Sequence, residues 1–264
     1  MAEIPFRDVP FRAGGFTPRT IPFAGAATLV LLLAMWQGAA SAGLISTRFL
    51  PPPIAIARAL ATLAASGELW AHLSASLQRF ALGWAMGTAA GLVAGFAIGL
   101  FTLFRTPGMA VVSALFPIPK IALAPLFIIW FGIGEGSKLA TLAFGVFFPT
   151  VINTVAGVDG VPRTLIRMGQ SFGLSWPAIV GKIVLPGALP AILSGFRITT
   201  STAVILLVAA EMIGADRGIG SYVLQAGNLY DTEGLMAGIV MLSALGLSVA
   251  WALGRLERWL LAWR

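Results

Sequence analysis

The chain has 264 residues, of which 58% are hydrophobic and 10% are charged, with a formal net charge of +7 and no cysteine. A soluble domain of this length cannot bury so much apolar surface, so the composition predicts a membrane protein. The absence of cysteine excludes disulfides, thiolate metal sites and cysteine nucleophiles.

Six stretches are apolar over about eighteen residues or more, which is enough to cross about 30 Å of hydrocarbon. They lie near residues 22–42, 78–104, 109–132, 138–157, 190–213 and 235–254. Because alternating β-type periodicity is absent, we expect an all-α integral membrane protein. The other predicted parts are a tail over 1–21, an outer connection over 43–77, a core over 78–254 that includes a cytoplasmic loop over 158–189, and a tail over 255–264.

The basic residues predict that both termini are cytoplasmic. The first 42 residues also resemble a signal peptide, but their apolar run is longer than a usual signal core, so we expect an uncleaved helix. The positive-inside rule then holds, and it explains the net charge without nucleic acid. The inner residues are Arg7, Arg12, Arg19, Arg105, Arg163, Arg167, Lys182, Arg197, Arg255, Arg258 and Arg264, and the outer ones are Arg48, Arg58, Arg79, Lys138 and Arg217.

The outer connection contains three consecutive prolines at 51–53, followed by an apolar helical pattern over 54–66 that we expect to lie along the membrane surface. The sole histidine, His72, precedes the second span. It has no second histidine with which to share a metal, so we interpret it as structural or interfacial.

The second span carries five glycines at a strict spacing of four residues. Such a stripe leaves a groove into which another helix can pack closely, and we expect that helix to belong to the same chain rather than to a dimer partner. The glycines are Gly83, Gly87, Gly91, Gly95 and Gly99.

The third span contains Pro117, Pro119 and Pro125, so we expect a broken helix of the kind that lines transport paths. Lys120 lies among these prolines, and a buried ammonium needs a partner or water. Glu211 is its candidate partner; alternatively, Lys120 extends toward the interface and Glu211 caps a helix. The candidate path residues are Pro117, Pro119, Lys120, Asn153, Arg197 and Glu211.

A basic, amphipathic segment follows the fourth span. Leu165, Met168 and Phe172 share one helical face, and Arg163, Arg167 and Gln170 share the other. Pro162 suits the first turn of this helix, Gly173 suits a helix end, Ser175 suits a cap for the next helix, and Pro186 and Pro190 are expected to end that helix. This helix-turn-helix could also be a plain interfacial loop or a DNA-reading unit, although the flanking spans disfavour DNA.

The spacing within this segment is Gly173, nine residues, Ile183, one residue, Leu185-Pro186. It resembles the EAA motif, the coupling loop of bacterial ABC importer permeases. The resemblance implies a six-helix type I importer domain in which a separate ATPase contacts Arg163, Leu165, Arg167, Met168, Phe172, Gly173, Leu174, Ile183, Leu185 and Pro186. The chain lacks a Walker A loop of its own, because Trp176 and Ile183 stand where glycine and Ser or Thr are needed.

Other segments resemble the nitrate, taurine and alkanesulfonate branch of these permeases, over about residues 45–260. They are Phe116 to Leu126, Trp130 to Gly134, Phe148 to Gly157, Ala210 to Gly214, Gly218 to Gly220 and Asn228 to Thr232. This resemblance implies a homodimer in the bacterial inner membrane, with two ATPase subunits and a periplasmic solute-binding protein. It implies no cofactor and no enzymatic activity. Where the family usually has an acidic residue and two alanines, this chain has Arg167-Met168-Gly169.

The expected mechanism is alternating access driven by ATP on the partner. A sulfonate, taurine or nitrate-like anion fits a path that contains Lys120, while a neutral or aromatic cargo such as a pyrimidine precursor stays open. An ion-coupled carrier is the alternative class, but it usually needs several acids within its spans, and Glu211 is the one carboxylate well within an apolar run. A membrane enzyme would need clustered donors that this sequence lacks.

Overall fold

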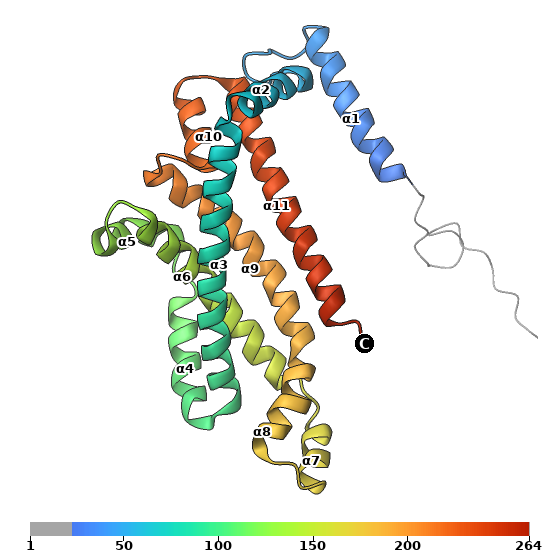
Figure 1. Cartoon of the computed structure of the whole chain (residues 1–264), viewed down its shortest axis with the longest axis vertical. Helices are drawn as coiled ribbons and strands as arrows, with labels where there is room; N and C mark the ends of the chain where they lie inside the picture. Colours follow the sequence, from blue (N-terminus) through green and yellow to red (C-terminus); the bar gives the residue numbers. More distant parts are fainter. Residues whose placement is uncertain (1–22, 264) are drawn as a thin grey trace, which may run out of the picture. The chain divides into compact units, whose positions relative to one another are not determined.

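The structure is a computed structural model that describes residues 23–263, which are helical apart from short turns (Figure 1). Five helices in this part of the chain are long and apolar enough to cross a membrane, and a bent helix pair gives a sixth crossing if its two parts form one span. The predicted all-α membrane fold is therefore confirmed. The predicted tail over 1–21, with its three arginines, and Arg264 lie outside the described residues. The chain divides into two compact units, one ending at Ile56 and the other beginning at Ala57, and each is described by itself.

The first unit contains α1 (Ala24–Ser41) and the start of α2 (Pro53–Ser66). The side chain of Gln37 in α1 accepts a hydrogen bond from the backbone N–H of Ile54, at 3.2 Å. Pro53 suits the first turn of α2 because a backbone N–H is not needed there.

The second unit begins with the last turns of α2 and continues into α3 (Glu68–Leu100) and α4 (Thr102–Leu115). The predicted span 78–104 begins after the first residues of α3 and extends beyond its last residue, Leu100. Phe101 has an extended backbone (φ −115°, ψ 122°), which ends α3 and reverses the chain into α4.

The third crossing is broken, as its prolines predict. After α4 comes a short 3₁₀ turn, η1 (Lys120–Leu123), and then α5 (Ala124–Phe131), at 87° to α4. Prolines at 117 and 119 cannot donate to a helix, so the chain leaves α4 there, and Pro125 suits the first turn of α5.

Helix α6 (Glu135–Asp159) forms the centre of the second unit, with fully buried Leu142, Val146 and Val151. The glycine stripe of α3 faces it. A Cβ atom placed at Gly87 would lie 2.4 Å from the carbonyl oxygen of Ala143, and the other four glycines of the stripe also face α6 side chains. The two backbones can therefore approach closely because these five residues are glycines, which have no side chain.

Beyond α6 lie α7 (Arg163–Ser171), α8 (Trp176–Ile179), a π turn η2 (Val180–Val184) and α9 (Leu185–Gly214). The prediction that Pro186 and Pro190 end a separate short helix is wrong, since both lie within α9 and the helix runs without a break from Trp176 to Gly214. In a regular α-helix the ring of Pro186 would meet the carbonyl of Lys182, and the wider π turn before it relieves that clash.

The chain ends with α10 (Ile219–Asn228) and α11 (Thr232–Leu260). The carboxylate of Asp231 caps α11 by accepting from the N–H of Gly234, at 2.9 Å. Ile219 of α10 packs with Met241 and Leu245 of α11. Within the second unit, α10 lies at one end and α7 with α8 at the opposite end (Figure 1), and these ends are called the α10 end and the α7 end below.

Candidate functional site

At the α7 end, two short helices form the turn that the glycine pattern predicts. Gly173 has φ +71°, and the N–H groups of Gly173 and Leu174 donate to the carbonyls of Gln170 and Gly169. This is the usual way for a glycine in the left-handed region to end a helix. Ser175 directly precedes α8, but its side chain makes no capping hydrogen bond, so the predicted cap is wrong.

One face of α7 packs against the rest of the unit and another does not. Ile166 packs on a small core made by Val161, Ile179 and Val184. Leu165, Met168 and Phe172 are exposed, and Phe172 is 79% exposed. The apolar face predicted from the sequence is therefore exposed in this chain.

The charged and terminal residues of this loop are also exposed. Arg163 and Arg167 lie at the surface of α7, Leu185 is exposed at the start of α9, and Pro186 is half-buried. Ile183 and Leu174 instead touch the small core. Of the ten residues predicted to couple to an ATPase, seven are exposed, and Leu174, Ile183 and Pro186 are half-buried. The exposed residues of α7 and the following turn are called the exposed knob below.

The unusual Gly169 lies on the packed side of α7. A Cβ atom there would be 2.8 Å from Cδ1 of Ile183. The glycine lets α7 lie close to the π turn, and an alanine would require the flexible end of Ile183 to move.

The broken third crossing places Lys120 at its elbow. The ammonium of Lys120 donates to the carbonyl oxygen of Phe116 and lies 4.7 Å from the ring centroid of Phe116 and 5.7 Å from that of Phe148. Pro117 and Pro119 are exposed beside it. The predicted pairing of Lys120 with Glu211 is wrong, because a backbone carbonyl freed by the proline break is a nearer acceptor.

Glu211 belongs instead to a charge cluster at the α10 end, which we define as Ser76, Arg79, Glu135, Lys138 and Glu211. The Glu211 side chain is 0% exposed and accepts from Arg79 Nη1 at 2.8 Å. It also accepts from Ser76 Oγ at 2.7 Å and from the backbone N–H of Gly220 at 2.8 Å. Glu211 thus caps the first turn of α10, the role weighed as the alternative, but in the protein interior.

The loop before α10 fits closely over Glu211. Gly218 has φ +146°, and a Cβ atom there would lie 2.4 Å from the carboxyl carbon of Glu211. His72 Nδ1 lies 2.9 Å from the oxygen and 3.1 Å from the nitrogen of the same glycine, so this histidine has a structural place. Burial raises the pKa of Tyr222, whose ring packs on His72.

Arg79 connects two carboxylates of different exposure. Its Nη1 faces buried Glu211, while its Nε and Nη2 hold Glu135 in a bidentate pair, with both distances 2.7 Å. Lys138 Nζ lies 3.4 Å from Glu135. The sequence analysis places Arg79 and Lys138 on the outer side of the membrane, and in the structure both side chains are buried and paired.

The remaining path candidates lie apart from this cluster. The side chain of Asn153 donates to the carbonyl of Pro149 and fits against Gly195 of α9. Arg197 pairs with Glu257 of α11, at 2.5 Å. The structure therefore does not bring Lys120, Asn153, Arg197 and Glu211 together into one site.

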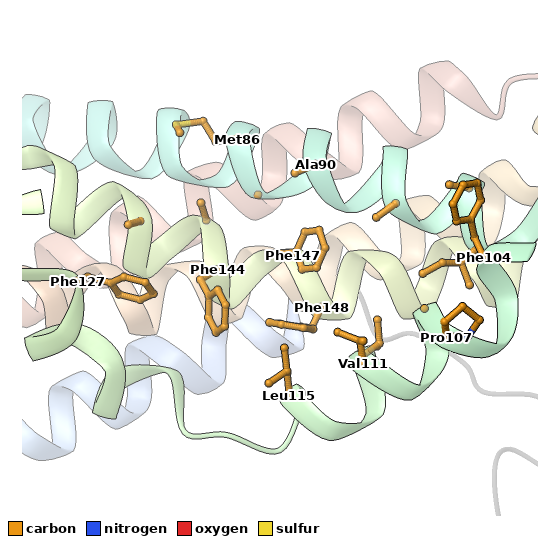
Figure 2. A pocket seen from close by; sticks show the side chains of 18 of the residues that line it. Met86, Ala90, Phe104, Pro107, Val111, Leu115, Phe127, Phe144, Phe147 and Phe148 are labelled. Carbon is orange, nitrogen blue, oxygen red and sulfur yellow. The ribbon is translucent and has the colours of Figure 1, made fainter. Parts of the chain in front are cut away.

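Two cavities flank the broken crossing. The larger, of 870 Å³, lies between α3, α4, α5 and α6 and is lined by apolar side chains, among them Phe127, Phe144 and Phe148 (Figure 2). The second, of 560 Å³, lies at the α10 end and is lined partly by polar residues, including Ser221, Gln225 and Asn228. A charged solute is unsuited to the first cavity, because its lining offers no hydrogen-bonding partners.

The sequence analysis missed Ser76, Glu135 and the burial of Arg79 and Lys138. One signal was available, because Arg79 lies at the start of the predicted span 78–104 and an ionisable residue within a span is costly unless it is paired. The identity of its partner was not available, since Glu211 lies 132 positions further along the chain.

Comparisons with known proteins match most of this chain. The family described as "Binding-protein-dependent transport system inner membrane component" matches residues 87–261. The taurine transport system permease protein of Escherichia coli is 38% identical over 241 residues, covering 89% of this chain and 88% of that protein. A protein of Bacillus subtilis named for aliphatic sulfonates transport is 35% identical over 237 residues, covering 89% and 85%. The riboflavin transport system permease protein of Chloroflexus aurantiacus is 34% identical over 236 residues, covering 89% and 88%.

Solved structures share the fold. A chain of the inward-facing MetNI methionine ABC transporter is 23% identical, with a TM-score of 0.58 over 74% of this chain and 95% of its own length. An amino acid ABC transporter solved with histidines is 14% identical, with a TM-score of 0.54 over 75% and 94%.

Proposed function

This chain belongs to the binding-protein-dependent transport system inner membrane components, the permease subunits of ATP-driven ABC importers, and we propose that α7 and α8 are the surface through which its ATPase drives transport. The permease itself is no enzyme, because ATP is hydrolysed on a separate subunit. The observation that carries the proposal is the exposed apolar face of α7, formed by Leu165, Met168 and Phe172. An apolar face rimmed by arginines on a rigid base is the kind of surface that protein partners bind.

The coupling proposal is tested by placing a charge on that face. In the complete importer, with its ATPase and binding protein, Leu165→Asp is expected to lower ATPase stimulation by the loaded binding protein about tenfold, because an interface core rejects an unpaired charge. Leu44→Asp is the matched control, since Leu44 is also an exposed leucine but lies between α1 and α2. Full stimulation of Leu165→Asp would contradict the proposal.

We propose that the cargo is a small organic sulfonate. The support is the identity to permeases named for taurine and aliphatic sulfonates, at 38% and 35%. The riboflavin permease, at 34%, favours an aromatic cargo as the second candidate. Uptake of labelled taurine, ethanesulfonate and riboflavin by proteoliposomes that hold the complete importer separates the two, and exclusive uptake of riboflavin would overturn the sulfonate proposal.

We propose that two copies of the chain form the translocation path between them. The large cavity within one copy is apolar (Figure 2), so it suits no charged cargo. Around the broken crossing, Ile129, Trp130 and Ile133 are exposed and available to a second copy. The mass of the purified complex, measured by native mass spectrometry, is expected to contain two copies, and a complex with one copy would exclude this path.

We propose that the α7 end faces the cytoplasm of a bacterial inner membrane, in which α1 and the other spans contact lipid and both termini are cytoplasmic. The excess of arginine and lysine on that side supports this orientation. Because the chain has no cysteine, Thr164→Cys and Leu44→Cys provide single labelling sites. An impermeant maleimide should label Leu44→Cys in intact spheroplasts and Thr164→Cys only after permeabilisation; the reverse result would refute the orientation.

The resulting mechanism is alternating access. A loaded binding protein docks at the α10 end, ATP draws two ATPase subunits together at the α7 end, and α7 and α8 transmit that motion as rigid-body tilting of the bundles. Hydrolysis then releases the cargo inward.

A further inference from the structure

Within the charge cluster, Arg79 binds the Glu135 carboxylate with the same two-point geometry that arginine uses for anionic ligands. Its two oxygens each lie 2.7 Å from a donor of Arg79, one from Nε and one from Nη2. The Arg79 side chain is 8% exposed and the Glu135 side chain is 58% exposed. A buried guanidinium edge therefore holds a carboxylate that reaches solvent.

Lys138 adds a second cation on the same side. Its side chain is 7% exposed, and within residues 23–263 its ammonium makes one hydrogen bond, to Glu135 at 3.4 Å. An ammonium has three donors, so two of them have no protein acceptor in this part of the chain. Lys138 also lines a small hollow with Ser137, Thr141 and Ile213.

Glu211 holds the Nη1 atom of Arg79, on the side of the guanidinium away from Nε. It is fully buried and accepts from Arg79, from Ser76 and from the backbone of α10. If Glu135 moves away, two cations and one carboxylate remain, and the local charge becomes positive. An anion that replaces Glu135 restores neutrality.

Glu135 lies at a helix start that follows a loop with two glycines, Gly132 and Gly134. Glu135 is the first residue of α6 and follows a loop in which Gly132 has φ +79°. A Cβ atom placed at Gly132 or Gly134 would meet nothing within 4 Å, so the loop has free space around it. The polar cavity at the α10 end adjoins this region, since Ile133 lines it and Ile213 lines both it and the hollow beside Lys138.

We propose that the Nε and Nη2 edge of Arg79 and the ammonium of Lys138 form a seat for the anionic group of the cargo, and that the Glu135 carboxylate occupies this seat until the cargo displaces it. The planar fork of arginine matches two oxygens of a sulfonate or carboxylate. The exchange is electroneutral, because one bound anion replaces another. This inference rests on the proposed function, since it deepens the proposal of an organic sulfonate cargo.

The test measures binding of ethanesulfonate to the purified full-length permease in phosphatidylcholine nanodiscs, which contain no anionic lipid. Glu135→Gln removes the competing carboxylate and is expected to tighten ethanesulfonate binding about tenfold, while the neutral ethanesulfonamide shows no such gain. Adding Lys138→Met to Glu135→Gln should return binding to the level of the parent. Glu233→Gln is the matched control, because Glu233 is an exposed glutamate in the first turn of α11.

Three outcomes would overturn the seat: no gain in Glu135→Gln, an equal gain in Glu233→Gln, or a gain that persists after Lys138→Met. In nanodiscs containing phosphatidylglycerol, a variant that retains more of this lipid but gains nothing for ethanesulfonate would assign the cations to a lipid headgroup and also overturn it. Uptake of taurine by the complete unmodified importer is measured in parallel. That uptake tests the proposed function alone, so the two failures are distinguishable.

Discussion

The two ends of the second unit differ in the residues that they bury and expose. At the α10 end, the charged side chains of Arg79, Lys138 and Glu211 are buried and paired, with Glu211 accepting from three groups. At the α7 end, the apolar side chains of Leu165, Met168 and Phe172 are exposed, with Phe172 79% exposed. The first arrangement holds helices of one chain together, and the second is suited to an outside partner. We therefore expect substitutions of the buried charged residues to lower the stability of the permease. We expect substitutions of the exposed residues of α7 to weaken its coupling to the ATPase.

The largest effect is expected from Glu211→Ala. Removing this carboxylate leaves Ser76 Oγ and the N–H of Gly220 without their acceptor, and leaves Arg79 Nη1 with the carbonyl of Arg217 but without its buried anion. Breaking a buried pair costs about 3–5 kcal/mol in the free energy of unfolding. Denaturant unfolding in mixed micelles measures the loss. Glu257→Ala removes the partner of Arg197, and this carboxylate is 22% exposed whereas that of Glu211 is fully buried. Its loss of stability should be much smaller. An equal loss in both variants would show that burial of the pair at the α10 end makes no difference to stability.

A smaller effect is expected from Gly87→Ala, in the contact between α3 and α6. The new Cβ atom would lie 2.4 Å from a backbone oxygen of Ala143, which cannot rotate away. Overpacking of this kind destabilises by about 1–3 kcal/mol. In Gly254→Ala the new Cβ atom meets nothing within 4 Å, so the same measurement should show no loss, or a gain of up to about 1 kcal/mol from helix propensity.

A still smaller effect, on coupling and not on stability, is expected from Arg167→Glu. Arg167 is exposed on α7, so reversing its charge should change the affinity for the ATPase subunit about two- to fivefold. Binding of the purified ATPase to the permease in nanodiscs measures this change, which should shrink at high salt. An unchanged affinity would show that Arg167 is no docking contact, although it stands where the family usually has an acid.

The smallest effect is expected from Arg105→Ala. Arg105 pairs with Asp159 at 2.6 Å, but both side chains are over 40% exposed, and solvent screens such pairs. Thermal unfolding should give a midpoint that cannot be distinguished from that of the parent. A clear drop would show that exposed pairs matter here as buried ones do.

The crossings and their break follow from local patterns, which is why they were predictable. Apolar length predicts the spans, and Pro117 and Pro119 predict the elbow, because a missing donor acts within one turn of the chain. The exposed knob on α7 was predictable for the same reason, since its face is set by helical periodicity alone.

The charge cluster was not predictable, because it depends on contacts between distant segments. Arg79 and Glu211 meet only once α3 and α9 are packed on α6 and the loop at Gly218 closes over them. Lys120 was paired with the wrong group because its acceptor is a carbonyl four residues before it, which no residue type reveals. Pro186 was misread because a π turn accommodates it.

That π turn has a mechanical consequence. Since η2 joins α8 to α9 without a break, one rod extends from Trp176 to Gly214, a length of about 55 Å. Its first turn is at the exposed knob, and Glu211 lies in its last. A rotation of this helix by about 5° about one tip moves the other tip by about 5 Å, so a modest displacement beside the exposed knob also moves the end that holds Glu211 and its partner Arg79.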